Sequence, residues 1–202
     1  MQRAPHREQL PDGPESIRPV YRQAVSESPA TPPTDDKDWT WVIQQPCPEC
    51  GYDPGTIPTE QIPDGLRRAA ARWQLVLQRP DITLRPSPQV WSPLEYAAHV
   101  RDVYVIMGDR AELMLTESEP TFPNWDQDAT ALENRYWEAD PATVAAEIAV
   151  AAERTAAVFG TVSPDQWDRN GFRSNSAVFT VRTLGIYCLH DLVHHLHDVS
   201  RR

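Results

Sequence analysis

Four long stretches of this chain carry apolar side chains at helical spacing, and this pattern constrains the fold more than any other feature. The clearest stretch begins at Ser92, an N-cap residue followed by Pro93 at the first helical position and by Glu95, which completes a reciprocal cap. The four helices are predicted over about 61–78, 92–115, 140–160 and from Thr180 towards residue 200. Because no convincing paired strands accompany them, we predict an all-α four-helix bundle.

The connections between these helices indicate how they are arranged. The link from the second helix to the third, about 116–140, is long and rich in Pro, Asp and Trp. A link of that length can cross the bundle, so the two helices that it joins can run parallel. Part of it, Ala129 to Asp140, is expected to form a short helix. Gly160 is expected to end the third long helix in the left-handed conformation that glycine adopts readily.

Composition divides the chain into three parts. Residues 1–36 hold seven of the 20 prolines and few large apolar side chains, so we predict a disordered Pro-rich tail. Residues 37–58 are expected to pack on the main body and to contain a Cys-x-x-Cys turn. Residues 59–202 are expected to form the bundle.

Charge and cysteine content exclude several classes of partner. The chain has 19 basic and 29 acidic residues, a net charge of −10, which argues against binding to nucleic acid or to an anionic membrane surface. We see no signal segment and no apolar run of the ~18 residues that cross a bilayer. Three cysteines, an odd number, do not form the disulfide framework of a secreted domain. We therefore expect a cytoplasmic protein.

Clustered histidines are the main chemical signal. His190 and His194 lie one helical turn apart and about 40° apart around the helix, so their imidazoles can converge on one metal ion. Both lie on the stripe of the last helix that is expected to face the bundle interior. His99 lies on the corresponding inward stripe of the second helix. A shared divalent metal would satisfy three interior imidazoles that otherwise need separate polar partners. Zinc suits such ligands best, and nickel, iron or manganese are compatible with imidazole.

Neighbouring side chains leave alternatives open. His195 lies about 140° from His190 and is expected to face outward, where Asp191 offers it a surface contact, whereas His197 competes as a ligand. Asp102 and Asp198 are candidates either to pair with histidines structurally or to orient them as ligands. The three interior histidines could also form hydrogen bonds within the core and bind no metal.

Cys47-Pro48-Glu49-Cys50-Gly51 resembles half of a zinc ribbon, whose turn directs two thiolates at one metal. A complete site needs two further ligands, and Cys188 lies deep in the last helix, where it is expected to fill the core. The favoured interpretation is a tight turn with semi-buried thiols, and a zinc knuckle or a redox pair are the alternatives.

Three segments together carry a family resemblance: 91–100 with its capped helix and inward His99, 179–181, and 187–198 with its His-x-x-x-His pattern. They resemble the DinB-like superfamily, which includes the mycothiol-dependent maleylpyruvate isomerase type, and the likeness covers about residues 60–200. It implies a four-helix bundle of up-down-down-up topology and a divalent metal held by His99, His190 and His194. The segment 122–128 resembles a loop of actinobacterial members.

The resemblance also implies an activity. Characterised relatives are transferases or isomerases that use a thiol such as mycothiol or bacillithiol, so we expect a thiol-dependent S-transferase with mycothiol and an electrophilic small molecule as substrates. A metal lowers the pKa of a coordinated thiol or water. The alternatives are a metal-dependent hydrolase with Glu95 or a nearby aspartate as base, and a non-catalytic binding or dimerisation module with structural metal or none. Candidate pocket residues are Tyr96, Tyr187, Trp125 and, for a substrate carboxylate, Arg173.

Overall fold

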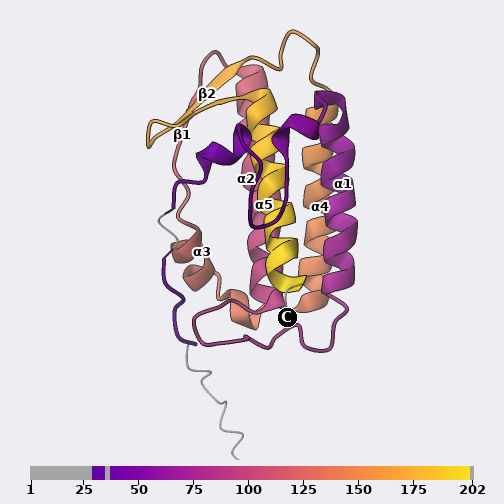
Figure 1. Cartoon of the computed structure of the whole chain (residues 1–202), viewed down its shortest axis with the longest axis vertical. Helices are drawn as coiled ribbons and strands as arrows, with labels where there is room; N and C mark the ends of the chain where they lie inside the picture. Colours follow the sequence, from indigo (N-terminus) through magenta and orange to yellow (C-terminus); the bar gives the residue numbers. More distant parts are fainter. Residues whose placement is uncertain (1–28, 35–36, 201–202) are drawn as a thin grey trace, which may run out of the picture.

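The computed structural model describes residues 29–34 and 37–200 and contains a bundle of four long helices. These are α1 (Ile62–Val76), α2 (Pro93–Thr116), α4 (Pro141–Gly160) and α5 (Val181–Ser200), shown in Figure 1. Both α1 and α2 pack against both α4 and α5. The predicted four-helix bundle is therefore confirmed, and each helix begins and ends within a few residues of its predicted bounds.

The direction of the helices confirms the unusual topology. In Figure 1, α1 and α5 run down the bundle, whereas α2 and α4 run up it, so that α2 and α4 are parallel neighbours. The crossover between them returns along the length of the bundle and contains α3 (Gln127–Glu133) and a 3₁₀ turn, η4 (Tyr136–Glu138). The short helix expected in this crossover is present but begins earlier than predicted and is split in two.

Side chains cap the starts of α2 and α4, and the cap at α2 is the one that the sequence predicts. The Ser92 hydroxyl accepts a hydrogen bond from the Glu95 amide, and the Glu95 carboxylate accepts one from the Ser92 amide at 2.8 Å. Asp140 accepts a hydrogen bond from the amide of Thr143 at the start of α4. These local signals fix where two of the four helices begin.

The end of α4 differs from the prediction. Gly160 is the last helical residue and does not adopt the left-handed conformation; Gly51 is the one glycine in 29–34 and 37–200 with positive φ. The amide of Thr161 donates to the carbonyl of Val158, which tightens the last turn and removes the need for a left-handed residue.

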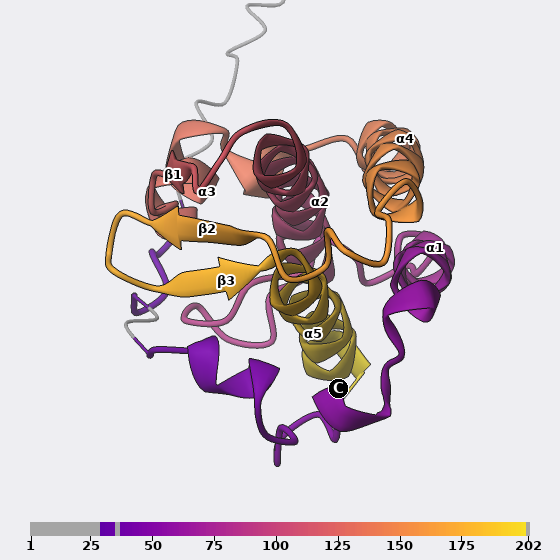
Figure 2. The same cartoon turned by 90° about the horizontal axis from the view of Figure 1, so that it is seen from above.

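A small sheet corrects the expectation that no strands pair. Its strands are β1 (Thr121–Phe122), β2 (Asn170–Arg173) and β3 (Val178–Thr180), with β1 parallel and β3 antiparallel to β2. The sheet lies at the end of the bundle where α2 ends and α5 begins, as Figure 2 shows. Strands of two to four residues are too short to display the alternation by which a strand is recognised in a sequence. The sheet joins the crossover to the loop that leads into α5.

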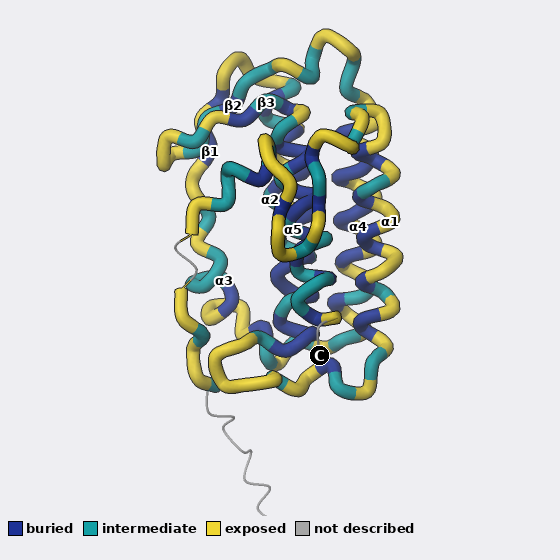
Figure 3. Tube along the Cα trace, viewed as in Figure 1, coloured by how far each residue is buried: buried dark blue, intermediate teal, exposed yellow. Residues whose placement is uncertain are grey.

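The bundle core is apolar but contains a few satisfied polar groups, and Figure 3 shows buried residues along the facing sides of the helices. The Trp73 indole donates a hydrogen bond to the Leu192 carbonyl at 3.3 Å. The Tyr104 hydroxyl donates to a carbonyl of α1 at 2.7 Å, and the Thr155 hydroxyl donates to the Tyr104 carbonyl at 2.7 Å. These bonds link neighbouring helices in a fixed register.

The segment 37–58 runs beside α5, and it contains two 3₁₀ turns, η1 (Thr40–Ile43) and η2 (Pro54–Thr56), followed by η3 (Thr59–Gln61) (Figure 2). Val42, Cys47 and Tyr52 are buried, and the Tyr52 hydroxyl donates to the Ile186 carbonyl of α5 at 3.2 Å. Most of the tail predicted over 1–36 lies outside the described residues. In the part of the chain that the structure describes, no helix is long and apolar enough to cross a membrane.

Candidate metal centres on the last helix

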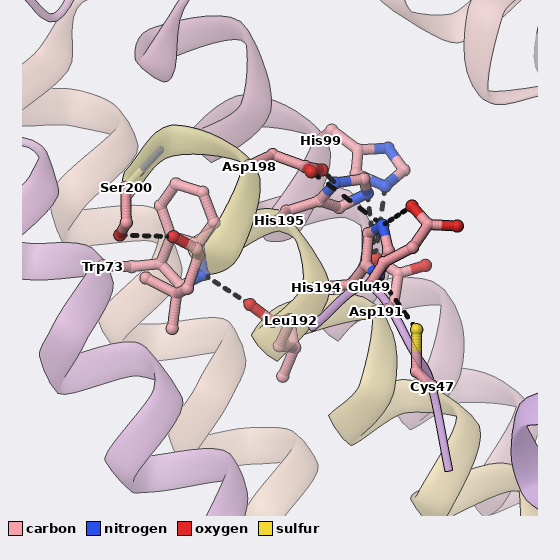
Figure 4. Close-up of polar contacts among 11 residues, drawn as sticks. Cys47, Glu49, Trp73, His99, Asp191, Leu192, His194, His195, Asp198 and Ser200 are labelled. Carbon is pink, nitrogen blue, oxygen red and sulfur yellow. Dashed lines mark hydrogen bonds and ion pairs between the residues drawn. The ribbon is translucent and has the colours of Figure 1, made fainter. Parts of the chain in front are cut away.

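Helix α5 presents two pairs of metal-binding side chains that are one residue out of phase. His190 and His194 form one pair, and Asp191 and His195 form the other. Members of each pair lie one turn apart on the same face, and the two faces differ by about 100° around the helix. The first pair faces the segment 37–58, where His190 packs on Tyr52 and His194 contacts Cys47. The second pair faces His99 of α2, and Figure 4 shows His194 beside Cys47 and Asp191 and His195 beside His99. One helix therefore contributes to two groups of donors.

One group joins α5 to α2 and contains the pair Asp191 and His195 together with His99. We call it the bundle group. The Asp191 carboxylate lies 3.3 Å from Nε2 of His99 and 3.5 Å from Nε2 of His195. One donor atom from each residue lies within 4.8 Å of the other two. Two imidazole nitrogens and a carboxylate oxygen thus face one another at the separation expected around a single metal ion.

Residues around the bundle group fix its orientation. Nδ1 of His195 lies 2.9 Å from the Asp198 carboxylate, which favours the tautomer that leaves Nε2 available on the side of Asp191. The Trp125 ring stacks on His99, with centroids 5.2 Å apart and planes 6° apart, and Tyr96 packs on His195 at 5.0 Å. Nδ1 of His99 is buried and has no hydrogen-bond partner among the described residues.

Charge in the bundle group also suits a cation. Burial alone raises the pKa of Asp191, but the hydrogen bond with His99 and the nearby histidines outweigh burial and lower the pKa to about 2. Asp191 is therefore ionised at neutral pH and places a negative charge between two imidazoles. A partly buried, ionised carboxylate beside two imidazoles is a donor set that fits a divalent metal.

The other group joins α5 to the segment 37–58 and contains the pair His190 and His194 together with Cys47 and Cys50. We call it the Cys–His group. Its four donor atoms lie within 4.8 Å of one another, and Sγ of Cys47 is 3.7 Å from Nδ1 of His194. Burial, together with the neighbouring His194, lowers the pKa of His190 to about 4, so this imidazole is neutral at pH 7.

The structure divides the three predicted ligands between the two groups. His99 belongs to the bundle group, whereas His190 and His194 belong to the Cys–His group. His195 was expected to face outward, but it packs against His99 with ring centroids 4.9 Å apart. Asp191, expected only to offer His195 a surface contact, lies between the two rings. The sequence does contain a signal for this pair, because Asp191 and His195 have the same four-residue spacing as the two histidines.

The other predicted site residues have different partners, and only some of these partners are histidines. Asp198 contacts His195, in the orienting role considered for it. Asp102 accepts hydrogen bonds from the Tyr136 hydroxyl and from Arg101, and Glu95 is 1% exposed and is bound by Arg85 as well as by the Ser92 cap. These contacts give Asp102 and Glu95 structural partners rather than histidines.

A cavity of about 910 Å³ lies beside both groups. Its walls include four residues of α5 from the two groups and all four predicted pocket residues: His190, Asp191, His194, His195, Tyr96, Trp125, Arg173 and Tyr187. The segment 37–58 contributes Lys37 and Trp39. This volume is at the upper end of the range for sites that bind small molecules.

Comparison with known proteins identifies relatives of the fold. A family model described as the DinB superfamily matches residues 66–199. A similar solved structure is that of YfiT from Bacillus subtilis, which is described as "a probable metal-dependent hydrolase with an unusual four-helix bundle topology". It is 21% identical, with a TM-score of 0.64, and the match covers 75% of this chain and 93% of that chain. No protein of curated function matches the chain.

Proposed function

The chain belongs to the DinB superfamily, and from this premise we propose that it is a metal-dependent enzyme acting on a small molecule in the cavity beside α5. The observation that carries the proposal is the convergence of His99, Asp191 and His195 next to that cavity. The proposal changes the ligand set predicted from the sequence. It keeps His99 and replaces His190 and His194 by the other pair on the same helix.

Each residue of the bundle group has a role in this proposal. His99 and His195 would bind the metal through Nε2, and the Asp191 carboxylate would supply the third donor. Asp198 would act as a positioning residue, because it holds Nδ1 of His195 at 2.9 Å. A divalent metal held in this way lowers the pKa of a coordinated water or thiol and polarises a substrate carbonyl. Zinc suits the donor set best, and nickel, iron and manganese are the other candidates.

We favour a hydrolase. Two histidines and one carboxylate are the ligand set of well-known zinc hydrolases, and three protein ligands leave a position for water. The structural relative YfiT is itself described as a probable metal-dependent hydrolase. Arg173, in the cavity wall, would bind a carboxylate or another anionic group of the substrate. Tyr96, Tyr187 and Trp125 would contact its apolar part.

The second candidate is a thiol-dependent S-transferase that uses mycothiol. The size of the cavity favours this alternative, because about 910 Å³ is more than a single small substrate requires and would admit a thiol together with an electrophile. Such a cosubstrate belongs to a reducing cytoplasm, which is where we expect the protein. A non-catalytic binding or dimerisation module is the remaining alternative, and it requires no open metal position.

Metal analysis followed by two assays tests the proposal. Metal content should fall in the His99→Ala/His195→Ala variant and should be unchanged in His197→Ala, which alters the same helix outside both groups. The metal-loaded protein is then assayed for hydrolysis of small esters and amides, and for loss of free mycothiol thiol in the presence of electrophiles. Hydrolysis that disappears with the His99→Ala/His195→Ala change supports the hydrolase. Metal content unaffected by that change would refute the proposed site.

A further inference from the structure

We propose that Cys47, Cys50, His190 and His194 form a second, structural zinc site that fastens the segment 37–58 to α5. This inference uses none of the three ligands of the bundle group, so it does not rest on the proposed enzymatic function. Two thiolates and two imidazoles are a typical donor set of structural zinc sites. They also neutralise the charge of Zn²⁺, since each thiolate carries one negative charge.

The turn around the cysteines has the geometry of a metal-binding loop. Gly51 adopts φ +74°, which favours glycine, and its amide donates to the Cys47 carbonyl at 2.9 Å. The Cys47 amide donates to the Tyr52 carbonyl at 2.8 Å. These bonds close the turn and bring both thiols to the same group of donors. The sequence identified this motif as half of a zinc ribbon and left the other two ligands unassigned.

Helix α5 supplies those two ligands. The 3.7 Å separation between Sγ of Cys47 and Nδ1 of His194 compares with about 3.6 Å for a sulfur and a nitrogen bound to one tetrahedral zinc, at bond lengths near 2.3 and 2.05 Å. His190 is 4% exposed, and its Nε2 is buried without a hydrogen-bond partner among the described residues. A buried imidazole nitrogen without a partner is costly, and zinc coordination within this group would remove that cost.

The surroundings favour a closed structural site over a catalytic one. The Trp39 ring packs on His194 and His190, with centroid distances of 4.8 and 5.6 Å, and Tyr52 packs on His190 from the segment 37–58 at 5.6 Å. Nε2 of His194 lies 3.8 Å from the Glu49 carboxylate, which would orient the ring. Four protein ligands complete a tetrahedral zinc and leave no open position.

The position of the site gives it a second consequence. Lys37 and Trp39, in the same segment as the two cysteines, line the cavity beside the bundle group. Zinc bound by Cys47 and Cys50 would therefore hold one wall of that cavity in place. We infer that removal of this zinc loosens the wall without removing any ligand of the bundle group.

The test uses the full chain, purified under reducing conditions, in four variants alongside the wild type. Two remove the proposed ligands, as Cys47→Ser/Cys50→Ser and His190→Ala/His194→Ala. Cys188→Ala is the matched control, because Cys188 is the third cysteine of the chain, is buried and lies outside both groups. The fourth variant, His99→Ala/His195→Ala, removes the bundle group alone. Circular dichroism is used to check that each variant is folded.

Zinc content is expected to fall by about one ion per chain, relative to the wild type, in Cys47→Ser/Cys50→Ser and in His190→Ala/His194→Ala, whatever metal the bundle group holds. After reconstitution with Co²⁺, the wild type should show a thiolate-to-cobalt charge-transfer absorption in the near ultraviolet. We expect this band to vanish in Cys47→Ser/Cys50→Ser and to persist in Cys188→Ala and in His99→Ala/His195→Ala. Limited proteolysis of zinc-depleted protein should cut residues 37–58 faster than in loaded protein.

Two outcomes would overturn the inference. One is a folded Cys47→Ser/Cys50→Ser variant with the metal content and the cobalt spectrum of the wild type. The other is a Cys47–Cys50 disulfide in protein kept under reducing conditions, which would indicate a redox pair. Because His99→Ala/His195→Ala reports on the bundle group separately, failure of this inference is distinguishable from failure of the proposed function.

Discussion

The buried ion pair between Arg85 and Glu95 makes a quantitative prediction about the start of α2. The Glu95 side chain is 2% exposed, and its carboxylate accepts hydrogen bonds from both Nε, at 2.9 Å, and a second nitrogen of Arg85. The amide and hydroxyl of Ser92 each donate to the same carboxylate at 2.8 Å. Glu95 is thus the centre of a buried polar network, although the sequence also suggests it as a catalytic base.

Replacement of Arg85 by alanine should therefore destabilise the fold substantially. Loss of one partner of a buried ion pair costs about 3–5 kcal/mol, because the remaining charge stays buried. The Arg85 side chain is 14% exposed, so water can partly replace it, and the two Ser92 donors remain. We expect a loss near the lower limit, about 3 kcal/mol, which increases the equilibrium constant for unfolding by more than about 100-fold. Glu95→Gln should cost less, about 1–2 kcal/mol, because the guanidinium that loses its charged partner is 14% exposed and the new amide oxygen can still accept its hydrogen bonds.

Urea unfolding followed by circular dichroism measures these changes in the free energy of unfolding. The double variant Arg85→Ala/Glu95→Gln should lose less than the sum of the two single losses, because both changes act on one ion pair. Metal content should be unchanged in all three variants. The reasoning fails if Arg85→Ala stays within about 1 kcal/mol of the wild type. A Glu95→Gln variant that is fully stable but inactive would instead indicate that Glu95 is the base.

Three further predictions concern helix packing and the bundle group. Gly108→Ala should destabilise the fold by about 1–3 kcal/mol, since the added Cβ would lie 2.6 Å from the Thr155 hydroxyl; a more stable variant in a urea titration would contradict this close approach of α2 and α4. Asp198→Asn should weaken metal binding at the bundle group by about 10–100-fold in a competition titration, and an unchanged affinity would mean that Asp198 does not position His195. Tyr104→Phe should cost about 1–2 kcal/mol in thermal unfolding through loss of its buried hydrogen bond, and no cost would show that the bond contributes nothing.

Local signals account for most of what the sequence predicted correctly. The cap at Ser92, with Pro93 and Glu95, fixes the start of α2 by bonds between residues that are close in the chain. The long link over 116–140 indicated parallel helices because its length alone permits a crossover of the bundle. The sequence does not reveal the small sheet, because its strands are very short and β1 pairs with a segment about 50 residues away, although β2 and β3 are close in the chain.

The division of the histidines could not be read from the sequence for a different reason. Helical periodicity gives the angle between two residues of one helix, such as about 140° between His190 and His195, but not the rotation of that helix against its neighbours. Both faces of α5 meet partners: α2 covers one, and the segment 37–58 covers the other. A single inward face on the last helix leads instead to one metal held by His99, His190 and His194.

The walls of the cavity come from several segments that are distant in the chain, whereas most of the metal-binding side chains beside it belong to one helix, α5. Lys37, Trp125 and Arg173 lie outside the four long helices, in the segment 37–58, in the crossover and at the end of β2. Substitutions in such segments are tolerated far better than substitutions in packed helices. In the enzyme that we propose, changes in these segments alone could therefore alter the substrate while the proposed metal ligands on α5 stay unchanged.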